Sequence, residues 1–217
     1  MTRIYSKRRK LSLFIIVQDS LSPYISTLFQ SFLITLNPSN TSSIKMTNSS
    51  QDEGISLLLD EKIHDFNCWR MDMKNLKEKI DISGRDFSGR NLSRAYLNGV
   101  SCIETNFSHS DLSKVNFAQS NLNRVNFEGA NLTETICMYA EMLDCNLMNC
   151  DLTKTNLMWA NLQNSNLTNC KMFKTILVEA TLKNAKLPTI DKKGAYLKYA
   201  KLEGTSWKVE ANNASHH

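Results

Sequence analysis

The sequence is poor in several kinds of residue, and each shortage excludes a class of protein. Its 217 residues include only seven Gly, three Pro and six Cys. Six Cys without a C-x-x-C pair are too few for a disulfide scaffold of this length. No run of about 18 apolar residues occurs, so we expect no membrane span. With 41% hydrophobic and 22% charged residues, the composition is that of a globular chain rather than a disordered one.

The net positive charge lies almost entirely in the amino-terminal segment. Residues 1–45 hold six basic residues against one acidic residue, whereas residues 46–217 hold 20 of each. A domain that binds nucleic acid needs a concentrated basic surface. The charge balance of residues 46–217 therefore predicts that nucleic acid is not a partner.

An apolar residue occurs at every fifth position from Ile82 to Leu187, which gives 22 in succession. Two residues before each centre, from Ala95 to Ala185, stands Ala, Ser, Thr, Cys or Val, and one residue before stands Asn or Asp in 14 of the 22 pentads. A period of five fits neither an α-helix nor a half-buried strand. We therefore expect a solenoid with four pentads per coil, one large and one small side chain inward on each side, and Asn or Asp at the corners.

These pentads resemble a known family. ANLTE at 130–134, VNFEGANL at 125–132 and CDLTKTNLMWANLQNSNL at 150–167 are similar to the A(D/N)LxX repeat of pentapeptide-repeat proteins. The resemblance covers residues 81–187, with a continuation to 207. It implies an all-β solenoid, a right-handed quadrilateral β-helix, with a short helical amino-terminal cap. The expected Asn or Asp is replaced at Tyr96, Ile136, Glu141, Lys171 and Ile176.

We expect five segments along the chain. They are a basic, Ser/Thr-rich leader at 1–50, disordered or not part of the native protein; a helical cap at 51–80; the β-helix at 81–187; a loop and closing coil at 188–207; and a tail at 208–217.

The leader has two interpretations. It is either a targeting peptide, although no clear cleavage site follows its apolar run, or the result of a start site placed too early, with translation beginning at Met46. The intact mass of the native protein would distinguish them.

The sequence predicts a protein without enzymatic activity, metal or cofactor. Its His residues do not lie at metal-ligand spacing with Cys, and no catalytic set follows from the repeat. A narrow coil filled by its own side chains has no room for a pocket. Five Cys fall at inward positions, where they act as small hydrophobic residues. Cys150 and Cys170 lie one coil apart, within reach of a disulfide, but the repeat favours reduced thiols.

One face of the predicted solenoid collects apolar residues at outward positions. They are Ile136, Met138, Tyr139, Met158, Trp159, Ile176 and Val178. Exposed patches with Trp, Tyr and Met are typical of interaction sites. We therefore predict a cytoplasmic interaction or scaffold module that binds a protein partner, or a second copy of itself, with Trp159 and Tyr139 as anchors. The alternative for this face is that the leader or the tail covers it.

The family resemblance implies a second candidate function, that of a DNA mimic which protects DNA gyrase, a type II topoisomerase, from inhibitors. Such a mimic needs a strongly acidic surface. Residues 81–187 hold ten acidic and ten basic residues, so protein binding is the preferred prediction.

Overall fold

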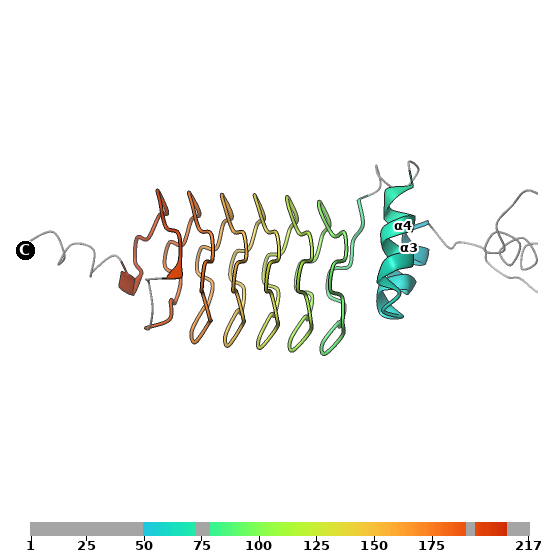
Figure 1. Cartoon of the computed structure of the whole chain (residues 1–217), viewed down its shortest axis with the longest axis horizontal. Coiled ribbons are helices and arrows are strands. Elements are labelled where there is room, and N and C mark those ends of the chain that lie inside the picture. The colour runs from blue at the N-terminus through green and yellow to red at the C-terminus, as the bar shows by residue number, and fades with distance from the viewer. Residues whose placement is uncertain (1–49, 73–78, 190–193, 208–217) are drawn as a thin grey trace, which may run out of the picture. The chain divides into compact units, whose positions relative to one another are not determined.

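The computed structural model describes residues 50–72, 79–189 and 194–207. All of them belong to one of the two compact units of the chain, Asn48–His217, and the description concerns that unit alone. Two helices, α3 (Ser50–Leu59) and α4 (Ile63–Met71), precede a stack of coils (Figure 1). The predictions for the leader and the tail lie outside the described residues. No helix in the described ranges is long and apolar enough to cross a bilayer.

The coils are held together by parallel backbone pairing between residues 20 positions apart. Asn91 pairs with Asp111, and Asp111 pairs in turn with Asn131. The pairing repeats on each of the four sides, so each turn of the chain has four sides of five residues (Figure 1). The predicted quadrilateral β-helix with a helical segment ahead of it is confirmed.

The interior is filled by one large and one small residue from each side. Phe87, Phe107 and Phe127 stack coil upon coil, with ring centroids 5.5 and 5.7 Å apart. Small polar residues of the interior donate to backbone oxygens, as Thr135 Oγ1 does to the carbonyl of Leu112 at 2.8 Å. Every buried side-chain nitrogen or oxygen in the described residues has a partner. At the small position of each side, the interior therefore admits only residues that are apolar or that can donate a hydrogen bond to a backbone carbonyl.

The corners lie elsewhere than the sequence pattern suggested. Asn and Asp occupy the flat, paired part of each side, where Asn91 Oδ1 accepts the N–H of Ser93 at 3.0 Å. The chain turns after the central residue, and the turn closes when Ala95 N–H donates to the carbonyl of Leu92 at 3.1 Å. The local hydrogen bonding expected of Asn and Asp is present, but their predicted position at the corner is wrong.

Sides without Asn or Asp keep the same backbone pairing. Ile136 pairs with Asn116 and Asn156, although its side chain offers no acceptor. The other exceptions named above also keep this pairing. The parallel backbone bonds therefore hold each side in place whether or not an Asn or Asp side chain is present.

The second residue after each centre, except for Thr189 after Leu187, adopts a left-handed backbone conformation. In the described coils, 18 non-glycine residues and five Gly occupy this corner position with φ between 56° and 74°. None of these residues is Val, Ile or Thr, although Ile103 and Val178 stand one position earlier. Positive φ is costly for branched side chains. The corner thus selects against β-branching.

The two helices close the amino-terminal end of the stack. Leu58 and Phe66 are fully buried. Asn67 accepts the N–H of Tyr96 at 2.8 Å and donates to the carbonyl of Arg94 at 2.9 Å. The buried Arg70 donates to the carbonyl of Asn98 at 3.1 Å. These side chains bind backbone groups of the first coil that no preceding coil pairs, as an edge requires.

At the other end, residues 194–207 continue the register after the loop. Tyr196 pairs with Ile176, and Lys201 pairs with Thr181. Trp207 is buried, and its Nε1–H donates to the carbonyl of Pro188 at 2.9 Å. Trp207 therefore ties the last coil to the start of the loop.

A first prediction tests the packing of α4. Replacing Phe66 with Ala should lower the free energy of unfolding by about 3–5 kcal/mol, because it leaves a cavity between α4 and the core. The matched variant Met71→Ala removes a side chain that is 62% exposed and should change stability by less than about 0.5 kcal/mol. Urea unfolding measures both, and equal effects would contradict the packing.

A second prediction tests the corner. Asn164 has φ of 61°, so Asn164→Val should destabilise the fold by about 1–2 kcal/mol. Gln163→Val, one residue earlier, should have little effect, since β-branched residues already stand at that position in other pentads. Thermal unfolding compares the two, and a harmless Asn164→Val would show that the corner carries no conformational selection.

Candidate functional site

The aromatic side chains at the surface gather on one side of the coils. We name it the Tyr/Trp face, formed by residues 95–99, 115–119, 135–139, 155–159, 175–179 and 195–199. Eight large hydrophobic residues are exposed in the described ranges, and six of them lie on this face: Tyr96, Ile136, Tyr139, Trp159, Tyr196 and Tyr199. The other two, Met71 and Phe173, lie elsewhere.

The Tyr/Trp face carries few charges. Its 30 residues include only Glu179 and Lys198, whereas the 25 residues of the preceding side, from 90–94 to 170–174, include nine charged residues. An apolar surface with so little charge is typical of the central part of an interface.

The predicted site residues lie together on this face at different depths. Ile136, Tyr139 and Trp159 are 38%, 51% and 37% exposed. The four others are half-buried: Met138, Met158, Ile176 and Val178.

The sequence pattern did not lead us to predict three exposed residues of the face, namely Tyr96, Tyr196 and Tyr199. The signal for the last two was available, because Tyr196 and Tyr199 follow Ile176 and Glu179 by one coil of 20 residues. The Pro-containing loop at 188 interrupted the pattern without shifting its register.

Tyr139 and Trp159 form a stacked pair with ring centroids 4.7 Å apart and planes 9° from parallel. Both stand at corner positions with positive φ. The centroid distance is close to the spacing of adjacent strands, about 4.8 Å, as expected for two residues that occupy the same position in successive coils.

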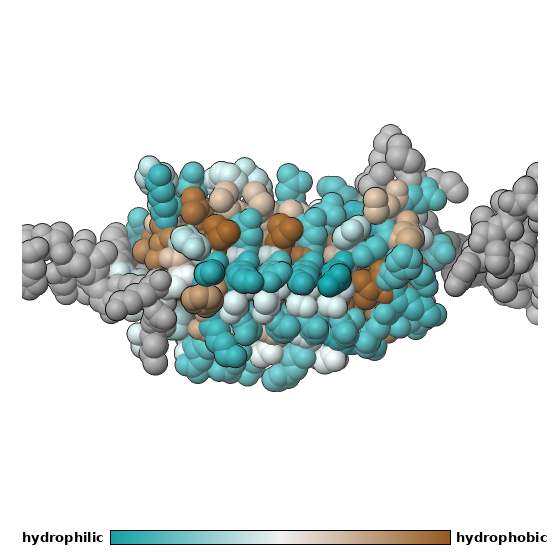
Figure 2. Space-filling model, viewed as in Figure 1, coloured by the Kyte–Doolittle hydropathy of each residue, from teal (hydrophilic) through white to brown (hydrophobic). Residues whose placement is uncertain are grey.

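A basic corner borders the face on the side where the chain enters it. Its column, one residue per coil, is Arg94, Lys114, Glu134, Lys154 and Lys174. Glu134 Oε1 accepts from Lys154 Nζ at 3.1 Å, and Lys114 Nζ lies 3.7 Å from Glu134 Oε2. The hydrogen bond and charge of Lys154, with Lys114 beyond, hold the pKa of Glu134 below its usual value. Figure 2 shows one side of the stack, where hydrophilic residues form such a row along the coils.

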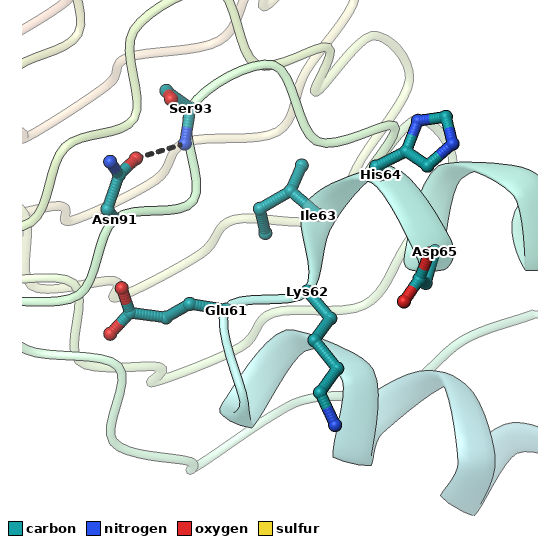
Figure 3. A pocket seen from close by; sticks show the side chains of 7 residues that line it. All are labelled: Glu61, Lys62, Ile63, His64, Asp65, Asn91 and Ser93. Carbon is teal, nitrogen blue, oxygen red and sulfur yellow. Dashed lines mark hydrogen bonds between the residues drawn. The ribbon is translucent and has the colours of Figure 1, made fainter.

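A shallow pocket of about 380 Å³ lies where α4 meets the first coils (Figure 3). Glu61, Lys62, His64 and Asp65 line it, with Asn91 on the coil side. In Figure 3 the side chains of Lys62 and His64 point away from Asn91, so the charged groups do not converge on a common point.

On α4, Cys68 Sγ lies 3.7 Å from His64 Nε2. The sequence-based prediction that no His lies at metal-ligand spacing from Cys overlooked the i, i+4 spacing of His64 and Cys68. No third His, Cys, Asp or Glu within the described ranges joins them in a group that could hold a metal ion.

All six Cys are free thiols, and only Cys68 is exposed. Burial raises the pKa of Cys137 and of Cys145 to about 12. The neighbouring Cys170 thiol, together with burial, raises the pKa of Cys150. Cys150 and Cys170 are not bonded to each other, and each Sγ donates to a carbonyl of the preceding coil, that of Phe127 or Leu147 at 2.9 Å.

The family model for pentapeptide repeats matches the chain in eight copies, at residues 80–113, 101–136, 110–147 and 140–177. This part of the chain belongs to the pentapeptide-repeat family, and its fold is the right-handed quadrilateral β-helix of that family. No curated protein matches the sequence.

Several solved structures are similar to this chain. HetL of the cyanobacterium Nostoc sp. strain PCC 7120, involved in regulating heterocyst differentiation, is 22% identical over 58% of this chain and 63% of HetL, with a TM-score of 0.39. A pentapeptide repeat protein of the Arabidopsis thaliana thylakoid lumen is 25% identical over the same shares, with a TM-score of 0.29. QnrB1, a plasmid-mediated fluoroquinolone resistance protein, is 17% identical over 64% of this chain and 89% of QnrB1, with a TM-score of 0.29. The chain thus spans less than two thirds of the first two structures.

A third prediction concerns the thiols. With a pKa of about 12, Cys137 and Cys145 are thiolate in only about one part in ten thousand at pH 8. Iodoacetamide at pH 8 should therefore alkylate one cysteine per native chain, Cys68, and all six after unfolding. Peptide mass spectrometry counts the labelled sites, and rapid native labelling of any of the five buried thiols would show that the coils open.

Proposed function

We propose that the chain is a non-enzymatic protein–protein interaction module that binds its partner through the Tyr/Trp face. One observation carries the proposal: six of the eight exposed large hydrophobic residues in the described ranges lie on a side that has only two charged residues. The largest exposed apolar patch of a monomer, about 300–600 Å², is often a functional site, especially where polar residues border it. A central Tyr or Trp of an interface typically contributes about 2 kcal/mol or more to binding.

The absence of enzymatic activity is part of the proposal and rests on how the reactive groups are used. The interior Ser and Thr side chains and three of the five buried Cys donate to backbone carbonyls, as Ser165 Oγ does to Met142 and Cys145 Sγ does to Leu122, and the other two Cys are buried as well. In this state they cannot reach a substrate. The pocket beside α4 is open, and its charged groups do not converge. Six free thiols also fit a reducing compartment, so we place the protein in the cytoplasm.

The charge distribution favours protein binding over DNA mimicry. Residues 81–187 hold as many basic as acidic residues, and several acidic side chains lie beside a base, as Glu104 does beside Arg124 at 2.8 Å. A DNA mimic needs unopposed acidic rows to enter a basic groove. The Tyr/Trp face instead offers apolar contact.

A fourth prediction tests the face. The double variant Tyr139→Asn and Trp159→Asn should lose the proteins that the wild-type chain captures in affinity purification from its native cell. Asn is chosen because it already occupies corner positions with positive φ, as at Asn149 and Asn169. Quantitative mass spectrometry compares the captured proteins.

The control is Phe173→Asn, which removes a side chain that is 57% exposed on another side. It should keep every partner, and the melting temperature of the double variant should stay within a few degrees of the wild type, since neither ring lies in the core. Unchanged capture by the double variant would exclude the Tyr/Trp face as the binding site.

A further inference from the structure

We propose that the Tyr/Trp face binds a second copy of this chain, so that two stacks lie side by side, parallel and with their coils in register. This inference rests on the proposed function, since it names the partner of the same face. Its support comes from the dimensions of the face, from its two outward ladders and from the charges along its borders.

The face is long and narrow. Six coils at about 4.8 Å extend about 29 Å, and a five-residue side with its turn is about 10 Å wide. The resulting area of about 300 Å² lies well below the 800 Å² or so that each partner contributes to a standard interface. A second stack is flat, equally long and equally narrow, so it can cover the face over its whole length. The small area predicts a reversible dimer.

Two rows of outward side chains, which we call ladders, run along the face. The first ladder holds the residue before the centre of each pentad, and the second ladder holds the residue after it. A two-fold axis parallel to the stack brings the first ladder of one copy against the second ladder of the other within the same coil. Ile136 then lies against Met138 of the second copy, and Ile176 against Val178. Apolar residues therefore meet apolar residues in both of these coils.

The borders of the face select the parallel arrangement. The parallel two-fold axis places the basic corner of one copy against the corner column of the other, which contains Tyr139, Trp159 and Glu179. Lys174 then faces Glu179 of the second copy, twice by symmetry. Lys154 and Glu134, which pair with each other within one copy at 3.1 Å, face Trp159 and Tyr139 of the second copy.

An antiparallel arrangement would set the two basic corners against each other. Their column has four basic residues and one acidic residue, Glu134, which Lys154 and Lys114 already engage. Like charges along the whole border disfavour that pairing.

Sedimentation velocity of the full chain tests the dimer. The wild type and Met71→Ala, which changes an exposed residue of α4 away from the face, should show a concentration-dependent dimer with the same dissociation constant, and the Tyr139→Asn, Trp159→Asn variant should weaken it at least tenfold. A chain that stays monomeric to hundreds of micromolar overturns the inference. Dimerisation that is insensitive to the double variant also overturns it, because the interface then lies elsewhere.

A charge exchange tests the parallel register. Lys174→Glu and Glu179→Lys should each weaken self-association, because each puts like charges together in both symmetric contacts. An equimolar mixture of the two variants should restore the dimer, since both contacts then join opposite charges. Lack of restoration in the mixture, with melting temperatures unchanged, overturns the register.

Cysteine cross-linking gives an independent readout of the register. In a Cys68→Ser background, Ile176→Cys and Val178→Cys proteins should form an intermolecular disulfide rapidly when mixed, and slowly when each is oxidised alone. Equal rates in all three samples overturn the parallel register. If self-association fails while affinity purification still shows partners lost in the Tyr139→Asn, Trp159→Asn variant, the proposed function holds and only the identity of the partner is wrong.

Discussion

The structure depends on one constraint, the parallel backbone hydrogen bonding between coils 20 residues apart. Leu92 N–H donates to the carbonyl of Asp111, and Asp111 N–H donates back to that of Arg90, both at 2.9 Å. Bonds of this kind join each coil to the next on every side, so every side chain lies over its counterpart one coil away. The stacked Phe core, the corners and the surface columns all follow from this register.

The same register explains how a narrow fold builds continuous features on its surface. A residue type that recurs every 20 positions becomes a continuous row at the surface, as the Glu134 column with its flanking lysines shows. Tyr139 and Trp159 stack because they occupy the same corner in successive coils. Substituting a few residues that lie 20 positions apart is therefore enough to change a whole face, while the core and the backbone bonds stay the same.

The ends of the stack obey a different requirement, because their backbone groups have no further coil to pair with. Asn67 and Arg70 on α4 supply side-chain partners for the first coil, and Trp207 donates to the carbonyl of Pro188 near the last. The helical segment that carries Asn67 and Arg70 has no five-residue period, so its contacts could not be derived from the pattern. Trp207 does lie on the period, but its hydrogen bond to the loop could not be derived from it.

The sequence by itself indicated the coil, the core and most of the face, because a five-residue period with one large and one small inward position fits a solenoid in which each pentad forms one side. With four sides per coil the register is 20 residues, which indicated the Tyr/Trp face from Ile136 to Val178. Only the tertiary structure decided which residue turns the corner. Residues of many types, such as Arg94 and Trp159 as well as Gly, adopt positive φ there, so the position does not stand out in the hydrophobic pattern of the sequence. The structure also showed that the register continues through Tyr196 and Tyr199 after the loop and that residues 63–71 form one helix, which brings Cys68 beside His64, because neither the path of a loop nor a short helix leaves a five-residue period in the sequence.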